Sequence, residues 1–418
     1  MVAAVGVLTV IASAAVAVLA TSEQQGMIGP TEDGAMQINS SDPLTLPVLL
    51  NGEDVLSVVK EQASMLEEQR SVIAEYVGVV ARQSREIATL NQHVCRLREG
   101  HLATFPGAGS VEEKWSGGVL APNGLIYGVP RDATSALIID PTAHTLDTTT
   151  ITGLPFDKAK WHGGVLAPNN NIYCFPSFHD SVLKIGPATN TADWTTITGA
   201  GAGIFKFRSG VLGNNGLIYG IPFYAAYVLI LDPSTDTIDT TTLSGAGMDI
   251  AKWFGGVVVP DGRIFGIPHH ASEVLIINPD TNTLDTTSIA GLSNGEKKWA
   301  GGVLANNGLI YGIPRFGDSV LIINPEAMTT DATSIAGLSG DNKWLSGVLA
   351  GNGKVVGIPF FSDAVLVIDP ETNTADITSL VSAGTGIAKF IGGVLAPNGL
   401  IYAIPNSADN LLVIDLGC

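Results

Sequence analysis

Short apolar runs alternate with turn residues along the C-terminal three quarters of the chain. The first unit of this pattern starts at Lys114 and contains four such runs, at 118–121, 125–129, 136–140 and 146–151. Each run is rich in Val, Ile, Leu, Thr or Tyr, as β-strands are, and none has the apolar period of a helix. The breaks carry turn sequences such as Pro-Asn-Gly, which suit a tight hairpin. The pattern predicts four antiparallel strands in each unit.

The same unit recurs seven times, and a Lys-aromatic pair marks its position in each copy. The pairs are Lys114-Trp115, Lys160-Trp161, Lys206-Phe207, Lys252-Trp253, Lys298-Trp299, Lys343-Trp344 and Lys389-Phe390, at steps of 45 or 46 residues. Four strands repeated at this period are typical of the blades of a β-propeller. The predicted fold class is an all-β seven-bladed β-propeller over 101–418.

The ends of this array predict how the ring closes. The seventh unit stops at Cys418 after its third strand, so it lacks a fourth. His101 precedes Lys114 by 13 residues, and Asp147, where the fourth strand of the first unit begins, precedes Lys160 by the same 13. We therefore expect strand 101–105 to complete the last blade, which removes two exposed sheet edges. The alternative is an open solenoid whose last blade has only three strands.

The repeat text also resembles a known family. Segments such as APNGLIYGVP at 121–130 and VLIINPDTNTLDTTSI at 274–289 are similar to the YVTN family of surface-protein propeller repeats. The resemblance covers about 101–418 and departs at Ile267-Pro268, where the family usually has Ala-Asn. It implies a propeller fold and little about activity, because propellers carry many unrelated functions.

A heptad pattern precedes the propeller and predicts a coiled-coil helix over 52–99. One core position holds Val59, Leu66, Ile73, Val80, Ile87 and Val94, and the other holds Val55, Gln62, Gln69, Tyr76, Gln83, Leu90 and Leu97. Six heptads of this kind indicate self-association, as dimer or trimer. The alternative is a single amphipathic helix packed on the propeller, but a helix of about 60 Å would overhang a blade.

The N-terminal segments predict the cellular location. Residues 1–20 are apolar and end in small residues, which is typical of a signal peptide, although a span of this length also suits a single uncleaved membrane anchor. Residues 21–51 form a polar linker, and Asn39 begins its one glycosylation sequon. We expect a protein of the secretory pathway, either extracellular or membrane-anchored.

Charge and cysteine content narrow the partners. The net charge of −18 and the lack of a dense basic patch argue against nucleic acid. In the repeat register Cys95 and Cys418 flank the missing turn of the split blade, so a disulfide between them would lock the ring in an oxidising compartment. The alternative is that both thiols are unpaired. Cys174 lies within a strand and is expected to be a buried apolar residue.

Candidate binding residues occupy the positions at which the units differ. These positions directly follow the Lys-aromatic pair and the Pro that ends the second strand, and both lie at one end of a propeller. The candidates are His162, Arg208, Phe223, Tyr224, His269, His270, Arg315 and Phe316. Aromatic, His and Arg side chains on loops of a rigid scaffold suit ligand contact. We expect replacement of Phe223, His269 and Arg315 together by Ala to abolish binding and leave thermal stability nearly unchanged; the alternative is ordinary loop variation.

These observations favour a binding protein that captures a protein or glycan at this end of the propeller. The alternatives are a propeller lyase or hydrolase, and a structural component of a surface coat. The near-identical units show no asymmetric acid–base constellation, and the histidines lack metal-ligand spacing, so we expect no cofactor and no metal. The repeated Lys is expected to be structural. The repeated Asp of each unit, such as Asp147, is expected to cap the turn between the third and fourth strands.

Overall fold

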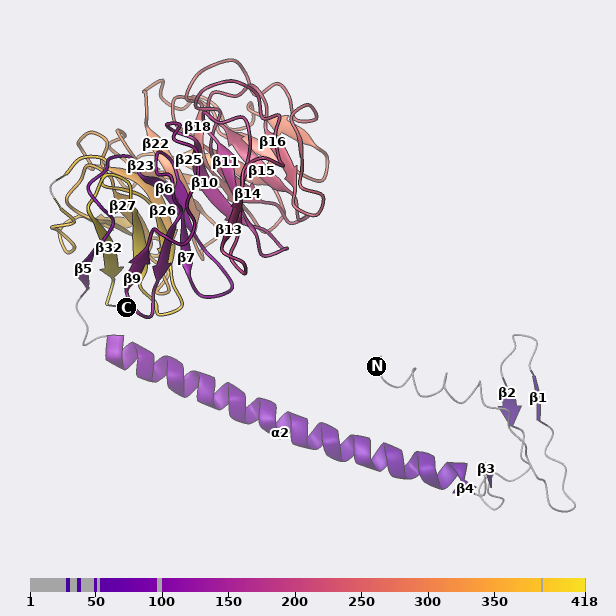
Figure 1. Ribbon diagram of the computed structural model, residues 1–418. Coiled ribbons are helices and arrows are strands. Elements are labelled where there is room, and N and C mark those ends of the chain that lie inside the picture. Colours follow the sequence, from indigo (N-terminus) through magenta and orange to yellow (C-terminus); the bar gives the residue numbers. More distant parts are fainter. Residues whose placement is uncertain are drawn as a thin grey trace, which may run out of the picture. The chain divides into compact units, whose positions relative to one another are not determined.

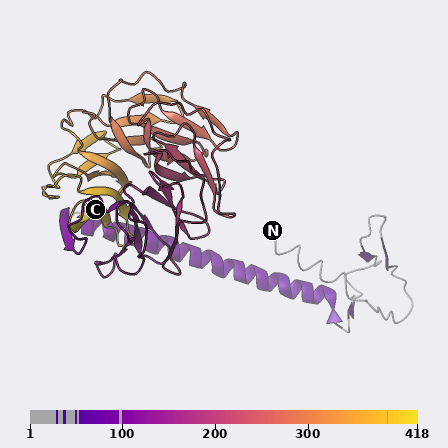
Figure 2. The same cartoon turned by 45° about the horizontal axis from the view of Figure 1, so that its top comes forward.

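Seven four-stranded antiparallel sheets form a β-propeller in the computed structural model of the protein (Figure 1). The structure describes the backbone of 28–30, 36–38, 49–50, 53–95, 100–384 and 386–417, and the side chains of 60–86, 100–384 and 386–417. The view in Figure 2 shows the same sheets arranged around a common centre. The seven-bladed all-β fold predicted from the repeat is therefore confirmed.

The strands follow one another in sequence order within blades 1 to 6, and blade 7 takes its fourth strand from the start of the repeat region. The first strands are β6 (Trp115–Leu120), β10 (Trp161–Leu166), β14 (Phe207–Leu212), β18 (Trp253–Val258), β22 (Trp299–Leu304), β26 (Trp344–Leu349) and β30 (Phe390–Leu395). The second are β7 (Ile126–Pro130), β11 (Ile172–Pro176), β15 (Ile218–Pro222), β19 (Ile264–Pro268), β23 (Ile310–Pro314), β27 (Val355–Pro359) and β31 (Ile401–Pro405). Blades are numbered 1 to 7 from β6 to β30, and first strands of neighbouring blades contact one another.

The outer strands are shorter. The third strands are β8 (Leu137–Asp140), β12 (Leu183–Gly186), β16 (Leu229–Asp232), β20 (Leu275–Asn278), β24 (Leu321–Asn324), β28 (Leu366–Asp369) and β32 (Asn410–Asp415). The fourth are β9 (Thr145–Asp147), β13 (Thr191–Asp193), β17 (Thr237–Asp239), β21 (Thr283–Asp285), β25 (Thr329–Asp331), β29 (Thr374–Asp376) and, for blade 7, β5 (His101–Pro106). β5 pairs antiparallel with β32, with Phe105 opposite Leu411, so the two ends of the repeat region share one sheet.

The apolar core lies between neighbouring blades. Trp161 of blade 2, for example, packs in one buried cluster with Val119 and Tyr127 of blade 1. Its indole Nε1 donates to the carbonyl of Ser181, 2.7 Å away, which satisfies the one polar atom of the ring. Each sheet therefore buries both faces, as the continuous apolar second strands suggest.

The repeated lysines join each blade to the one before it. Lys252 Nζ donates to the carbonyls of Ala225 and Phe223 in blade 3, at 3.0 and 3.4 Å, and to that of Asp249, at 2.8 Å. Burial lowers the pKa of Lys252 to about 8, so the ammonium stays protonated at neutral pH. Lys114 makes the same link across the closure, from blade 1 to the carbonyl of Ala408 in blade 7. The predicted structural role is therefore observed, with main-chain carbonyls as partners.

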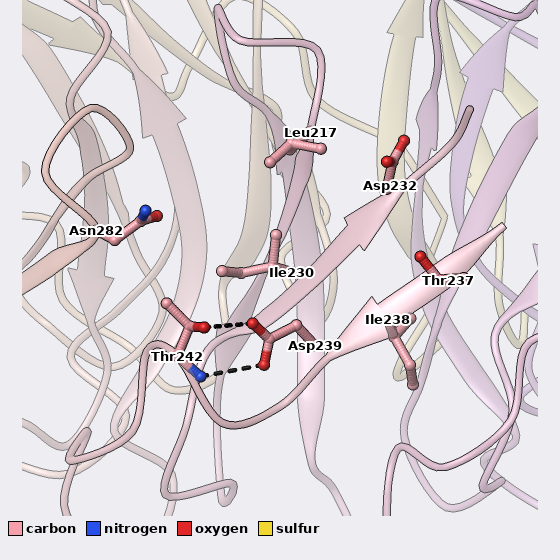
Figure 3. A pocket seen from close by; sticks show the side chains of 8 residues that line it. All are labelled: Leu217, Ile230, Asp232, Thr237, Ile238, Asp239, Thr242 and Asn282. Atoms are coloured by element: carbon pink, nitrogen blue, oxygen red, sulfur yellow. Dashed lines mark hydrogen bonds between the residues drawn. The ribbon is translucent and has the colours of Figure 1, made fainter. Parts of the chain in front are cut away.

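The repeated Asp caps a different turn from the one expected. Asp239 ends β17, and its carboxylate accepts from the main-chain N–H and the hydroxyl of both Thr241 and Thr242. Figure 3 shows the bonds to Thr242. The fourth strand therefore stops after three residues, because these side-chain bonds replace the strand ladder. The turn between the third and fourth strands is capped instead by the residue that ends the third strand, as Asp232 does for Ser234.

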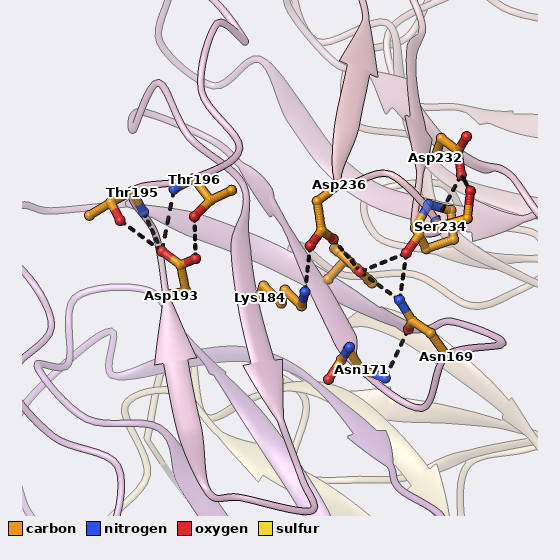
Figure 4. A network of polar contacts seen from close by, with 11 residues as sticks. Asn169, Asn171, Lys184, Asp193, Thr195, Thr196, Asp232, Ser234 and Asp236 are labelled. Atoms are coloured by element: carbon orange, nitrogen blue, oxygen red, sulfur yellow. Dashed lines mark hydrogen bonds and ion pairs between the residues drawn. The ribbon is translucent and has the colours of Figure 1, made fainter.

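A second set of polar links between blades lies at the end of the propeller opposite to the repeated lysines, where the Asn-Gly hairpin turns lie. Asn169 Nδ2 donates to Tyr173 Oη at 2.9 Å and to the carbonyl of Pro233 in the next blade at 2.6 Å (Figure 4). Tyr173 Oη in turn donates to Asp236, which also pairs with Lys184. We call this end the turn end, and the end that carries the Lys-aromatic pairs the lysine end.

The N-terminal part contains the short strands β1 (Ile28–Pro30), β2 (Met36–Ile38), β3 (Leu49–Leu50) and β4 (Glu53–Asp54), and the helix α2 (Val55–Cys95). One helix thus occupies most of 52–99, and a coiled coil remains a prediction. No helix among the described residues is long and apolar enough to cross a membrane. The predicted signal segment 1–20, Asn39 and the proposed Cys95–Cys418 pair lie outside the residues whose side chains are described, and Cys174 is buried as expected.

We predict that Lys252→Met weakens the propeller. The methionine keeps an apolar stem of similar length but leaves the carbonyls of Ala225 and Asp249 without their donor, so the free energy of unfolding should fall by about 1–3 kcal/mol. Calorimetry should show a lower melting temperature. Lys158→Met, at an exposed lysine, is the matched control and should melt like the parent. Equal melting of all three proteins would contradict a structural role of the lysine ring.

Candidate functional site

A bulge near the start of each first strand places one or two residues of every blade out of the regular ladder. Between β6 and β7 the register shifts between Trp115 and Gly118, and the same irregularity occurs in all seven blades. Bulges bend a strand and redirect its side chains. In six blades the residue after the Lys-aromatic pair lies in this bulge, whereas in blade 2 His162 still pairs with Phe175 and Gly163 occupies the bulge. The bulge explains how a position inside a strand can present a variable side chain.

Small residues hold the first strands close together next to the bulge. Gly117 has a φ of +95°, and a Cβ there would lie 3.2 Å from the Cα of Gly163 in the neighbouring blade. A Cβ on Gly392 would lie only 2.7 Å from the Cα of Gly117. Such close approach favours glycine, which occupies this position in five blades, with serine in the other two.

The variable residues of blades 3 to 7 form an apolar cluster. Its members are Phe223, Ala251, Phe254, Ala300, Leu345, Phe360 and Ile391, all of them buried. They come from the two variable positions and one adjacent loop, and they pack directly against one another across five blades. This cluster is therefore a small second apolar core at the lysine end, where the first strands of the blades meet.

Arginine and histidine side chains of blades 2 to 5 lie against this cluster. His162 in blade 2 lies with its Nδ1 2.7 Å from the carbonyl of Arg208, and its ring meets Phe254 edge-on at 5.5 Å. In blades 4 and 5, His269 Nε2 lies 3.1 Å from Arg315 Nη1. Arg131 of blade 1 pairs with Glu113 at 2.8 Å. Three arginines thus approach one centre from blades 1, 3 and 5.

Arg208 is held by aromatic rings. Its guanidinium carbon lies 4.7 Å from the ring centroid of Phe205 and 4.9 Å from that of Phe223, so both rings contribute cation–π attraction. Burial first, then the charges of Arg131 and Arg315, lower the pKa of Arg208 to about 9. The effect of the two other arginines on this pKa shows that the three positive charges act on one another.

The buried histidines are neutral at physiological pH. Burial, and then the charge of Arg315, lower the pKa of His269 to about 2. Burial, and then the charges of Arg208 and Arg131, hold the pKa of His162 well below its usual range. A histidine in this state can accept a hydrogen bond, as His269 does from Arg315, but it is a poor proton donor near pH 7.

Several buried polar atoms of this centre have no hydrogen-bond partner among the described residues. They are Ser116 Oγ, Arg131 Nε, Ser177 Oγ, Arg208 Nε, His269 Nδ1 and His270 Nε2. All six belong to the two variable positions or the residue directly after them, in blades 1 to 4. Buried polar groups are nearly always hydrogen-bonded, so the concentration of six without a partner makes this centre the candidate functional site.

The structure brings the eight candidate residues into one connected group. Tyr224 stacks on Phe223 with ring centroids 5.2 Å apart, His270 stacks on His269 at 4.9 Å, and Phe316 lies 5.9 Å from the Arg315 guanidinium. Phe223, His269 and His162 are 5, 1 and 4 % exposed, so their removal would open cavities. For Phe223 and His269 this burial argues against the expectation that they can be replaced together with Arg315 at little loss of stability.

The candidate set did not include some residues of this centre. Arg131, Ser116 and Phe254 lie at the same two variable positions as the candidates, and that placement was the signal that could have found them. Phe205 lies outside both positions, directly before Lys206, so nothing in the repeat pattern indicated its contact with Arg208.

A pocket also lies beside the outer strands of blade 3, away from this centre. It has a volume of about 280 Å³ and is lined by Leu217, Ile230, Asp232, Thr237, Ile238, Asp239, Thr242 and Asn282 (Figure 3). Its two carboxylates are those that cap neighbouring turns, so its polar groups already have structural partners. Among the described residues no group of three or more His, Cys, Asp or Glu side chains could hold a metal ion.

Comparison with known proteins shows the fold. No protein-family model and no curated protein matches the sequence. A streptogramin B lyase structure has a TM-score of 0.61 at 12% identity, covering 76% of this chain and 97% of that one. Virginiamycin B lyase from Staphylococcus aureus has a TM-score of 0.60 at 10% identity, covering 76% and 100%.

A third similar structure is the extracellular domain of a protein from B. thetaiotaomicron described as a one-component system. Its TM-score is 0.57 at 13% identity, and the match covers 76% of this chain and 43% of that one. At these identities the likeness shows the propeller fold alone. Membership of the YVTN repeat family remains a prediction.

We predict that the buried histidines make the propeller sensitive to acid. Below pH 6.5 the unfolded chain binds a proton at His269 that the folded chain does not bind, so stability falls as the pH decreases from 6.5 towards 2. At pH 5 this one residue should account for about 2 kcal/mol of lost stability. Thermal unfolding between pH 7 and pH 5 measures the slope.

His269→Gln should reduce that slope by about one proton, because glutamine does not titrate. Thr142→Gln, at an exposed side chain without a titratable group, is the control and should keep the parental slope. A parental slope in the His269 variant would show that this residue takes up its proton in the folded state.

Proposed function

We propose that this protein is a binding module that works outside the cell, with its recognition surface at the lysine end of the propeller. The observation that carries this proposal is the distribution of exposed apolar side chains. Nine of the ten large ones in the propeller lie in loops at that end: Val111, Phe156, Phe178, Ile204, Met248, Ile250, Phe361, Val381 and Ile387. The tenth, Ile377, follows a fourth strand.

Apolar side chains gathered on one face of a soluble fold are typical of an interaction surface. We call these nine residues the apolar rim. Phe156 is 92% and Met248 is 85% exposed, so neither contributes to the propeller core. The turn end differs, because its repeated Asn, Tyr and Pro residues are occupied in links between blades. Function and scaffold are thus separated at opposite ends, which supports a partner at the lysine end.

An enzyme is the less favoured alternative. Two of the similar structures are lyases, but at 10–12% identity they share only the fold. The buried histidines of the centre contact arginine, aromatic rings and a carbonyl, and this setting makes them poor proton donors. A protein or glycan partner suits the combination of an apolar rim with a cationic, aromatic centre.

Self-association through α2 would multiply such contacts. Side chains at the predicted core positions are exposed in the single chain, with Leu66 at 57%, Ile73 at 62%, Tyr76 at 68% and Val80 at 59%. A row of exposed apolar residues at heptad spacing favours a coiled coil with further copies of this chain. Several propellers on one stalk would raise a weak contact to useful avidity. An extracellular location is in keeping with the extracellular domains among the similar structures.

We predict that charge in the heptad core dissociates the assembly. Ile73→Asp with Val80→Asp would place carboxylates in a desolvated seam, and sedimentation equilibrium should then give the mass of one chain. Ser71→Asp with Arg85→Asp, outside the two core positions, is the control and should keep the parental mass. A parental mass in the core variant would show that α2 does not mediate assembly.

We predict that the apolar rim carries partner binding. The labelled full chain, applied to an array of glycans and acidic peptides, should bind at least one class, and Phe156→Ser with Met248→Ser should weaken that binding at least tenfold. Both residues are exposed, so the melting temperature should not change. Asp280→Ser with Glu326→Ser, at exposed positions of the turn end, is the control. Equal binding by both variants would contradict recognition at the lysine end.

A further inference from the structure

Two of the three arginines at the centre of the lysine end have no carboxylate partner among the described residues, although buried guanidinium groups usually have one. Arg131 has one partner, Glu113, whose side chain is 45% exposed. Neither Arg208 nor Arg315 forms an ion pair with a carboxylate within the part of the chain that the structure describes. Arg315 contacts only neutral acceptors there, namely Asn342 Oδ1 at 2.8 Å and His269 Nε2. The centre is therefore positive in a chain whose net charge is −18.

The geometry of Arg208 leaves its in-plane edge for a ligand. The rings of Phe205 and Phe223 lie within 5 Å of its guanidinium carbon and take up cation–π contact, whereas its buried Nε has no acceptor. A guanidinium group binds an oxyanion through this edge, with two parallel N–H donors. Arg131 Nε is likewise without a partner. A buried cation with unused donors destabilises the fold unless something compensates it.

Neutral donors occupy the same two variable positions in blades 1 and 2. Ser116 and Ser177 are 0 and 1 % exposed, and neither hydroxyl has a hydrogen-bond partner among the described residues. Serine hydroxyls and arginine N–H groups together form a set of donors that suits carboxylate, sulfate or phosphate oxygens. The apolar cluster that contains Phe254 and Phe360 borders this set and lowers the local dielectric, which strengthens attraction for an anion.

We propose that the centre of the lysine end is a binding site for an oxyanion, with Arg208 as its main ligand and Arg131, Arg315, Ser116 and Ser177 as further donors. The proposal rests on the proposed function, because it names the chemistry by which that same surface holds its partner. A carboxylate or a sulfate on a glycan or peptide would supply the group. The rim residues would then contact the rest of the partner, outside the centre.

The test uses the full chain with simple anions as probes. Calorimetric titration and thermal unfolding are measured with acetate, benzoate, sulfate and inorganic phosphate at constant ionic strength, with benzyl alcohol as the neutral probe. At least one oxyanion should bind in a saturable way and raise the melting temperature. Acetate and benzoate report a carboxylate site, whereas sulfate and phosphate report a tetrahedral one. Absence of saturable binding by all four anions would overturn the proposal.

Three variants locate the site. Arg208→Gln should weaken the bound oxyanion at least tenfold, and without ligand its melting temperature should equal or exceed that of the parent, because an uncompensated buried charge is removed. Arg208→Lys keeps the charge but loses the planar edge, so it should bind with intermediate affinity. Lys158→Gln removes an exposed positive charge from a lysine-end loop and should bind like the parent.

Each outcome decides between specific and general effects. Equal weakening by Arg208→Gln and Lys158→Gln would indicate only bulk electrostatics and would overturn the site. If Arg208→Gln does not fold, the affinity of Arg208→Lys decides, and parental affinity there would also overturn it. If array binding depends on the rim while no oxyanion binds, the oxyanion site is wrong and the proposed function still stands. If oxyanions bind and the rim variants leave array binding unchanged, the oxyanion site stands and recognition by the apolar rim is wrong.

Discussion

The hydrogen bonds from the seven buried lysines to main-chain carbonyls are the constraint on which the rest of the propeller depends. Lys252 binds the carbonyls of Phe223 and Ala225 in the preceding blade, and Lys114 makes the equivalent link across the ring closure. Such a link involves only the main-chain atoms of the neighbouring blade. The side chains on the linked loop can therefore vary from blade to blade while the geometry between blades stays the same.

This division explains why the candidate site lies where it does. The residue whose carbonyl a lysine holds is often the residue whose side chain reaches the centre: Phe223 does so in blade 3, and Arg315 in blade 5 through its carbonyl to Lys343. The backbone of the site is thus positioned by an interaction that repeats seven times, and its side chains are positioned by contacts that occur once. A buried, partly unsatisfied centre persists because the surrounding ring supplies the stability.

The fold could be predicted from the sequence because every blade repeats the same local instructions. Apolar second strands, Asn-Gly turns and the Lys-aromatic pairs all indicate one unit, and seven copies leave little choice of architecture. The candidate residues could be predicted only as positions that differ. Their burial could not, since it depends on a bulge that redirects Ser116 or Arg208 and on contacts between blades 46 residues apart, such as that of His162 with Arg208. The turn that Asp239 caps could not be predicted for a similar reason. The sequence places this residue at the start of the fourth strand, whereas the strand is so short that Asp239 ends it and caps the turn that follows.

The net charge of the chain and the local charge of the lysine-end centre have opposite signs. A chain with a net charge of −18 repels most anions at long range, yet its lysine-end centre concentrates Arg131, Arg208 and Arg315 beside aromatic rings. At physiological ionic strength long-range repulsion is screened beyond about 8 Å, whereas a partly buried cationic centre is screened much less. An anion that reached the centre of the lysine end would therefore meet a local field opposite in sign to that of the whole molecule. Selectivity would follow from shape, because only a group able to pass the apolar rim would reach that field.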